Sequence, residues 1–235
     1  LDAGGYFIIN GSEKTCLAQE RAAENIVYCF NTVKSTKWSW STEVKSVPDF
    51  KCISPKQISM MVSRKNNGFG YSIYIQLPRM KNPIPLFMLF RSLGVISDSS
   101  ICDYILLNKN HKDNCDMLSA LQGSVIDSNK VLTYESAFEY IIGQVMYTPM
   151  NMDKETGAKK KMEFANEILE TDLFPHCKEK EQKIYYLGYM TNRLLKSYLG
   201  YNNQDDRDSY LNKRIDLTGT LLNNLFRNYF NKLVK

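Results

Sequence analysis

The sequence lacks several patterns that would assign a function at once. No apolar run approaches the roughly 20 residues that a helix needs to cross a bilayer, which excludes a membrane-spanning helix of the usual kind. No C-x-x-C pair occurs, so the usual spacing of a zinc site is missing. Internal repeats and low-complexity segments are also absent, which excludes a repeat array. The function must therefore be inferred from less direct patterns.

Histidine and cysteine are too scattered to predict a metal site. His111 lies four residues before Cys115, and His176 directly precedes Cys177. Two isolated pairs of this kind do not supply the four ligands of a structural zinc ion. We expect the six cysteines to be reduced, in a reducing compartment, rather than to bind metal or form disulfides.

The composition is that of an ordinary globular protein. The 235 residues are enough for one large domain or two small ones, and 43% of them are hydrophobic and 23% charged. A net charge of +5 permits an anionic partner without demanding one. The chain starts at Leu1 and residues 232–235 continue a helical pattern, so we expect a fragment of a longer polypeptide.

The first 21 residues combine a strand pattern with a polar cluster. The apolar residues 6–9 precede a turn at Asn10-Gly11-Ser12, and Lys14, Gln19 and Arg21 follow. A tight Asn-Gly turn offers backbone N–H groups and a neighbouring cation to phosphates. This segment is therefore a candidate contact with an anionic partner.

Alternating apolar residues predict antiparallel strands from residue 24 to residue 77. Residues 24–45 are strand-like, and Ile58, Met60 and Val62 alternate with polar residues. The same alternation covers 71–77, and the glycine-containing loop between these two runs predicts a β-hairpin. Because each strand has one face to bury, the sheet should be covered on one side.

The sequence period becomes helical after Pro83. Residues 83–93 are apolar nearly all round, and Gly94 is placed to end that helix in a left-handed conformation. Gly123 is placed to end a later helix. Side chains that suit N-cap positions predict helix starts at Asp98, Asp113 and Thr133.

Two long apolar stripes at helical spacing lie at 184–198 and 217–233 and predict core or domain-packing faces. Residues 150–161 form the best candidate for a linker. We interpret Lys159-Lys160-Lys161 within them as the solvated start of the next helix, rather than as a phosphate contact.

Acids and bases alternate closely between those two helices, in residues 204–217. Three acids there would suit a two-metal site that clamps a phosphoryl group: Asp205, Asp206 and Asp208. Arg207 and the Lys213-Arg214 pair supply counter-charge, so a self-paired cluster that fixes the local conformation is at least as consistent. Because basic side chains also hold phosphates and Asp or Asn can meet the edge of an unpaired base, charge pairing and nucleic-acid contact stay equally open.

Several long blocks resemble the second-largest subunit of cellular RNA polymerases, and they occur in that family's order. They are GGYFIINGSEK at 4–14 with AQER at 18–21, IPLFMLFRSLGVISD at 84–98, YLGYM at 186–190, DDRD at 205–208 and NKRIDLTGTLLNNLFR at 212–227. The resemblance is strongest to the RNA polymerase II type. Thr218 and Thr220 depart from it, since the family has Ala and Pro there. Together with lysine- and asparagine-rich loops, these departures suggest a divergent version from a large DNA virus or a protist.

The resemblance implies an α+β fold in which one domain is inserted into another. Antiparallel strands with packed helices would form the lobe, between two segments of a second α+β unit, the protrusion. The expected boundaries are 1–25 for the end of the first protrusion segment, 26–204 for the lobe and 205–235 for the start of the second protrusion segment. The lobe would form one wall of the cleft through which downstream DNA enters.

The resemblance also implies where nucleic acid is contacted. Lys14, Gln19 and Arg21 would lie near template and hybrid. Asp208, with Lys213 and Arg214, occupies the position at which bacterial relatives contact the unpaired non-template base. Arg207 stands where the bacterial pattern has an apolar residue, which favours a positioning role over base reading.

We expect no catalytic residue and no cofactor in this segment. The resemblance places the catalytic Mg²⁺ of the parent nucleotidyltransferase on the largest subunit. The implied partners are that subunit, the remainder of this subunit's own chain, downstream DNA with its template and non-template strands, and initiation factors or small subunits on the lobe. The implied location is intracellular, in a nucleus, a cytoplasmic viral factory or a virion, without a membrane partner.

A protein-docking module without direct nucleic-acid contact is the alternative function. It predicts an exposed apolar or mixed patch, for which Trp38 and Trp40 are candidates, although cross-strand packing explains these tryptophans better. An independent nuclease that uses the three acids would need bound metal and cleavage activity.

Overall fold

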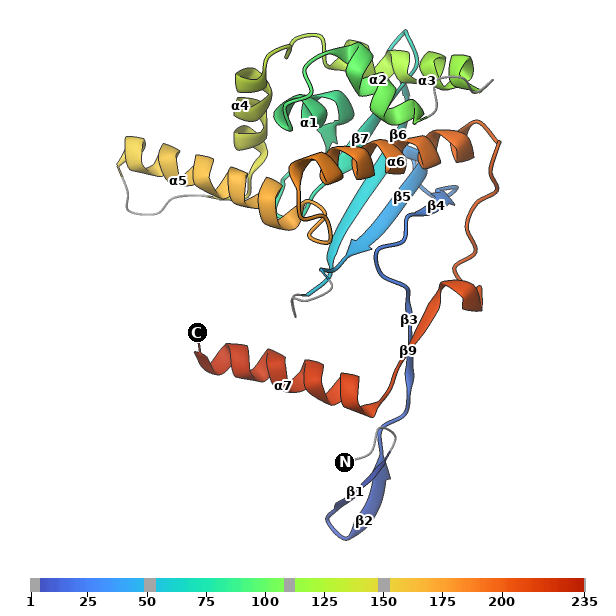
Figure 1. Ribbon diagram of the computed structural model, residues 1–235, viewed down its shortest axis with the longest axis vertical. Helices are drawn as coiled ribbons and strands as arrows, with labels where there is room; N and C mark the ends of the chain where they lie inside the picture. Colours follow the sequence, from blue (N-terminus) through green and yellow to red (C-terminus); the bar gives the residue numbers. More distant parts are fainter. Residues whose placement is uncertain (1–4, 49–53, 108–112, 148–152, 235) are drawn as a thin grey trace. The chain divides into compact units, whose positions relative to one another are not determined.

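The chain forms two compact units in a computed structural model that describes residues 5–48, 54–107, 113–147 and 153–234 (Figure 1). Unit 1 combines both ends of the chain, residues 1–23 and 206–235. Unit 2 is the continuous segment 24–205. Antiparallel sheets and packed helices together give the α+β fold that the sequence predicts.

Unit 2 is built on a five-stranded antiparallel sheet of order β4-β5-β6-β7-β8. Each strand lies beside its neighbour in sequence, so the sheet is a meander. The strands are β4 Tyr28–Asn31, β5 Trp38–Ser46, β6 Lys56–Asn66, β7 Tyr71–Gln76 and β8 Ile84–Pro85.

The predicted hairpin is formed by β6 and β7. Its loop contains Gly68 and Gly70, both at positive φ, and the Asn66 side-chain oxygen accepts hydrogen bonds from the N–H groups of both glycines, at 2.8 and 3.2 Å. Ile58, Met60 and Val62 are fully buried while their neighbours in β6 are not. The alternation therefore gives the sheet one covered side, as predicted.

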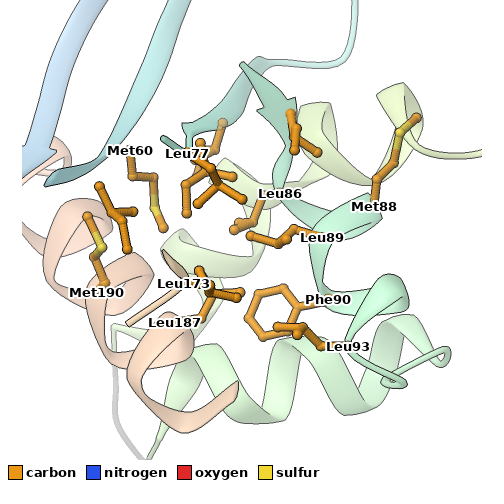
Figure 2. Close-up of a cluster of buried hydrophobic side chains, with 14 of the residues drawn as sticks. Met60, Leu77, Leu86, Met88, Leu89, Phe90, Leu93, Leu173, Leu187 and Met190 are labelled. Atoms are coloured by element: carbon orange, nitrogen blue, oxygen red, sulfur yellow. The ribbon is translucent and has the colours of Figure 1, made fainter. Parts of the chain in front are cut away.

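Helices cover that side of the sheet and supply the other half of the core (Figure 1). Figure 2 shows how Met60 from the sheet faces Leu187 and Met190, with Leu89 and Phe90 alongside. The helices of unit 2 are α1 Leu86–Ser92, α2 Asp98–Leu106, α3 Asn114–Asp127, α4 Tyr134–Gln144, α5 Lys154–Glu167, the π-helical turn η1 Ile168–Asp172 and α6 Lys180–Tyr198.

Two of the predicted helix boundaries are confirmed by their capping geometry. Helix α1 is followed by Gly94 at φ 93°, the left-handed conformation that favours glycine. Helix α4 starts with a capping box in which Thr133 accepts from the Ser136 N–H and Ser136 accepts from the Thr133 N–H. Local sequence alone was sufficient at these positions.

Of three other predicted helix ends, the one at Gly123 is wrong, whereas those at Asp98 and Asp113 are right in position but not in their capping role. Gly123 does not end a helix, since α3 continues to Asp127; a Cβ at Gly123 would lie 2.8 Å from the backbone carbon of Gly70, so glycine is needed for close helix-to-strand packing. Asp98 is not an N-cap, because Ser97 precedes α2 and the Asp98 carboxylate binds the buried Arg91. Asp113 precedes α3, but its side chain makes no capping hydrogen bond.

The predicted linker at 150–161 lies partly outside the described residues, at 150–152. From Lys154 onward it is helix α5, so this part is not an extended linker. Lys159 and Lys160 are exposed on that helix, so the lysine run is solvated as interpreted, but it lies in the middle of α5 and not at its start.

The two long apolar stripes are both helical but differ in burial. In α6, Leu187, Met190 and Leu194 are completely inaccessible. In α7, Thr218–Val234, the stripe stays open, with Phe226 68% and Leu233 83% exposed. The second stripe is therefore not core within the described chain, and domain packing is the remaining interpretation.

Unit 1 consists of two small ribbons and one helix. The hairpin of β1 Tyr6–Ile9 and β2 Ser12–Thr15 turns at Asn10 and Gly11, both at positive φ, which confirms the predicted Asn-Gly turn. The second ribbon pairs β3 Gln19–Ala22 with β9 Lys213–Asp216, from opposite ends of the chain. A short 3-10 turn, η2 Tyr210–Asn212, precedes β9, and α7 follows it.

No helix in the described ranges combines the length and the apolar character that crossing a bilayer requires.

Candidate nucleic-acid interface

All of the contact residues predicted from the sequence lie in unit 1. The exposed ones are Lys14, Gln19, Arg207, Asp208 and Arg214, while Arg21 and Lys213 are half-buried. The positions are far apart in the sequence, and the fold brings only some of them together. The β3–β9 ribbon gathers four of them, and the others lie on the β1–β2 hairpin and in the loop before η2.

The β3–β9 ribbon sorts its polar residues onto two faces. Arg21 lies directly opposite Arg214, and Gln19 lies opposite Asp216. Because directly paired residues and residues two apart share one face, these four side chains line the same face of the ribbon. Lys213 is opposite Ala22 and therefore lies on the other face. The predicted set is thus divided between two faces.

Asp216 is the residue of this face that sequence reasoning missed. Its carboxylate forms an ion pair with Arg21, at 3.0 Å from Nε to both Oδ atoms. Like charges directly opposite each other weaken a strand pair, so Asp216 offsets part of the repulsion between Arg21 and Arg214. The alternation of charge in the sequence did not indicate this contact, because the partners are 195 positions apart.

Arg214 is held against the backbone at the start of β9. Its Nη1 donates to the carbonyl of Lys213 at 2.8 Å. The Arg214 side chain is exposed, so its remaining guanidinium N–H groups can donate to a phosphate.

The loop with Arg207 and Asp208 is fixed by its own side chains. The Asp208 N–H donates to the Asp206 carboxylate at 2.9 Å, a turn typical of aspartate, and Asn212 donates to the Asp206 carbonyl at 3.4 Å. Asp206 is therefore part of the local scaffold. Asp208 keeps an exposed carboxylate beside it.

Asp205 does not belong to this loop cluster. It lies in unit 2, where its carboxylate accepts from the Cys29 N–H at 2.7 Å and binds Arg193 at 2.8 and 3.0 Å. The counter-charge for Asp205 thus comes from α6, and the predicted pairing with Arg207, Lys213 or Arg214 is wrong for this acid. No group of three potential metal ligands is found among the described residues, so the three acids do not form a metal site there.

Lys14 lies on β2, opposite Phe7 in the hairpin register. All four residues of β2 are exposed. The Asn10-Gly11 turn ends the same hairpin, so the cation and the turn belong to one small element.

Trp38 and Trp40 are packed across strands, as predicted from their alternation with serines. Trp38 contacts Tyr74 with ring centroids 5.8 Å apart, and Trp40 lies against the unit 2 core. Both rings are half-buried, so they do not form the exposed docking patch of the alternative function.

The geometry defines an α+β protein whose larger unit has a helix-covered meander and whose smaller unit carries an exposed ribbon with basic residues. The family described as RNA polymerase Rpb2, domain 2, matches residues 23–216. The chain belongs to this family, that of the second-largest RNA polymerase subunit.

Individual relatives support the same assignment. The DNA-directed RNA polymerase II subunit RPB2 of Encephalitozoon cuniculi is 38% identical over 99% of this chain and 20% of its own length. The subunit RPB2 of Schizosaccharomyces pombe is 34% identical over 100% of this chain and 19% of its own length. DNA-directed RNA polymerase subunit 2 of Acanthamoeba polyphaga mimivirus is 32% identical over 99% and 20%. The chain spans about a fifth of the length of these curated relatives.

Proposed function

We propose that this chain is part of the second-largest subunit of a DNA-dependent RNA polymerase, a nucleotidyltransferase, and that it positions nucleic acid there. Unit 2 would be the lobe and would form a wall of the downstream DNA cleft. Unit 1 would be the protrusion portion, with segments 1–23 and 206–235. Support comes from the family match across 23–216 and from the division of the chain into these two units.

The pairing of Arg21 with Arg214 is the observation that carries the positioning role. Two guanidinium groups and one carboxylate on the same ribbon face leave an excess of positive charge. A phosphate backbone would offset the remaining repulsion, since it offers closely spaced negative charges. Lys14 and Lys213 would add contacts from the hairpin and the second face of the ribbon.

The loop before η2 would position the strand rather than read a base. Asp208 is exposed and could accept from an unpaired base, but Arg207 beside it would hold a phosphate. The hydrogen bond from the Asp208 N–H to the Asp206 carboxylate fixes the backbone that carries Arg207 and Asp208. The role that we propose for Asp208 is therefore to support this turn and the neighbouring Arg207.

Further protein would complete the assembly. The partners proposed are the largest polymerase subunit, the remainder of this subunit's chain, initiation factors and small subunits, within a nucleus or a viral compartment. The exposed apolar face of α7, on which Phe226 and Phe230 stack with ring centroids 5.8 Å apart, supports a contact with more protein. Mg²⁺ for the reaction would be held by another subunit.

Photo-crosslinking in the assembled polymerase tests the positioning role. A photoreactive residue is placed at Arg214 or at Lys14 of the full-length subunit, in a transcribing complex with labelled DNA and RNA. We expect crosslinks to nucleic acid from both positions. The matched control is Lys232, an exposed lysine of α7 in the same unit. Crosslinks from position 232 alone, or from none of the three, would contradict the proposal.

A further inference from the structure

A cavity of about 370 Å³ lies entirely within unit 2. None of its described lining residues belongs to the candidate nucleic-acid interface. It forms where the end of α1, the start of α4, η1 and the start of α6 meet. Its volume is within the range of about 300 to 1,000 Å³ that is usual for small-ligand sites. Three lysines line it, Lys178, Lys180 and Lys183.

Lys183 is a buried cation in the wall of this cavity. It is only 5% exposed, and its ammonium donates to the backbone carbonyls of Leu169 at 2.9 Å and Glu170 at 2.5 Å. No carboxylate lies within ion-pair distance of it in the described part of the chain. A buried cation whose hydrogen bonds go to neutral carbonyls is costly, so this position favours an anion nearby.

The other cationic groups stand at the mouth of the same cavity. Lys180 Nζ lies 5.9 Å from the centre of the Tyr134 ring, and Lys178 is exposed. Glu170 is the one acidic residue among the lining residues. Among the described lining residues, three ammonium groups and one carboxylate give a net charge of +2.

The preference of the cavity for an anion does not come from the N-terminus of α6. Its capping box is complete, with the Glu179 side chain accepting from Gln182 N–H and the Gln182 side chain accepting from Glu179 N–H. The Gln182 oxygen also accepts from the Lys178 N–H at 3.0 Å. The side chains of Lys180 and Lys183 are therefore the donors that the cavity offers to a ligand.

We propose that this cavity binds a phosphoryl group, as a phosphate monoester or inorganic phosphate. Such a group carries about −1.5 to −2 charges at neutral pH and three strong acceptor oxygens, which matches the excess charge and the three lysines. Tyr134 and Asn166 line the same cavity and provide further polar groups, while Leu93 and Leu169 give it apolar walls.

Lysine footprinting tests the proposal on the assembled polymerase that contains the full-length subunit. The rate at which an amine reagent modifies Lys178 and Lys180 is followed by mass spectrometry while inorganic phosphate, or N-acetyl-phosphoserine amide, is titrated at constant ionic strength. We expect saturable protection of both lysines. Lys45 and Lys130 are exposed and lie outside the cavity, so they should keep their reactivity.

Substitution identifies the groups that hold the ligand. Lys183→Met should raise the phosphate concentration at half-protection by about tenfold or more, because a hydrogen bond to a charged group contributes about one factor of ten in affinity. Lys180→Gln, monitored at Lys178, should act in the same direction and leaves the buried residues untouched. The double variant Lys45→Gln/Lys130→Gln is the control for a general loss of positive charge.

The two probes separate the sources of the phosphoryl group. Tighter protection by the phosphoserine derivative supports a phosphorylated protein segment, and tighter protection by inorganic phosphate supports a free phosphate ligand. Equal protection by N-acetyl-glutamate amide would overturn the phosphoryl specificity. Absence of protection by both phosphates, or protection that persists unchanged in Lys180→Gln, would overturn the site itself.

Discussion

Units 1 and 2 contain equally clear amphipathic helices, but only unit 2 buries them. Helix α6 places Leu187, Met190 and Leu194 in a core shared with the sheet, whereas α7 leaves Phe226, Tyr229 and Phe230 at least half exposed. An apolar stripe therefore predicts a helix without predicting what covers it, because burial depends on the other elements present. Unit 2 buries its own apolar stripe, whereas the stripe of unit 1 stays exposed in the described chain.

The largest expected difference in stability comes from replacing one phenylalanine in each unit by alanine. Phe90→Ala removes a side chain that is 0% exposed and should destabilise unit 2 by about 3 to 5 kcal/mol. Phe226→Ala removes one that is 68% exposed and should change the stability of this chain by about 0.5 kcal/mol or less. Amide hydrogen exchange in β6 and in α7 measures each unit separately. Equal losses from the two variants would contradict the comparison.

Replacing glycine by alanine should lower the stability of α6 and raise that of α7. A Cβ at Gly188 of α6 would lie 2.3 Å from the Tyr104 carbonyl oxygen, so Gly188→Ala should separate α6 from α2 and cost about 2 to 3 kcal/mol. At Gly219 of α7 nothing lies within 4 Å of the added Cβ, so Gly219→Ala should stabilise that helix by about 0.5 kcal/mol. Denaturant unfolding followed by exchange in each helix checks both signs. A tolerated Gly188→Ala would mean that the two helices are not in close contact.

A hydrogen bond between the sheet and α3 should make unit 2 sensitive to alkaline pH. Tyr74 donates to Asp127 at 2.8 Å, and burial together with this bond raises the pKa of Tyr74 to about 12. Because the unfolded tyrosine ionises near pH 10, the stabilisation is complete below about pH 10 and is lost as the pH rises toward 12.

Tyr74→Phe tests this contribution. It should cost about 1 kcal/mol at pH 8, and the difference from the unsubstituted protein should shrink by pH 11. Unfolding free energies at the two pH values provide the measurement. Tyr71→Phe is the control, since Tyr71 lies on the same strand at the surface and has no hydrogen bond to this carboxylate. A difference that is constant with pH would argue against the Tyr74–Asp127 bond.

The smallest effect should come from the ion pair of unit 1. Asp216→Asn removes the partner of a half-exposed Arg21 and should cost about 0.2 to 1 kcal/mol. Asp205→Asn in unit 2 should cost more, because that carboxylate also accepts the Cys29 N–H and binds Arg193 through both oxygens. Exchange rates of the Ala23 and Cys29 amides report on the two sites. A larger loss from Asp216→Asn would reverse the comparison between the units.

Local sequence patterns predicted the elements better than their contacts. The Asn10-Gly11 turn, the Thr133 cap and Gly94 depend on a few adjacent residues, so the sequence was sufficient for them. Gly123 was misinterpreted because its role depends on Gly70, which is distant in sequence and close in space. The same limit applies to the partner of Asp205, which no local spacing indicates.

The candidate site shows this limit most clearly. Its residue types could be chosen from the sequence, since exposed lysine and arginine in short strands and turns suit phosphates. Their arrangement could not, because the opposition of Arg21 to Arg214 and the position of Lys213 on the other face follow from strand pairing between the two ends of the chain. Asp216 was missed for the same reason.

The salt dependence of DNA binding by the assembled polymerase tests the central claim most directly. In one full-length subunit, Arg207, Lys213 and Arg214 are replaced by glutamine; in a matched subunit, the exposed Lys45, Lys130 and Lys160 of unit 2 are replaced instead. Each lost phosphate contact lowers the slope of log K against log salt by about 0.7 to 0.9, so the first variant should lose about 2 to 3 from the slope and the second less than about 1. An unchanged slope in the first variant, or an equal loss in both, would contradict the assignment of nucleic-acid positioning to unit 1.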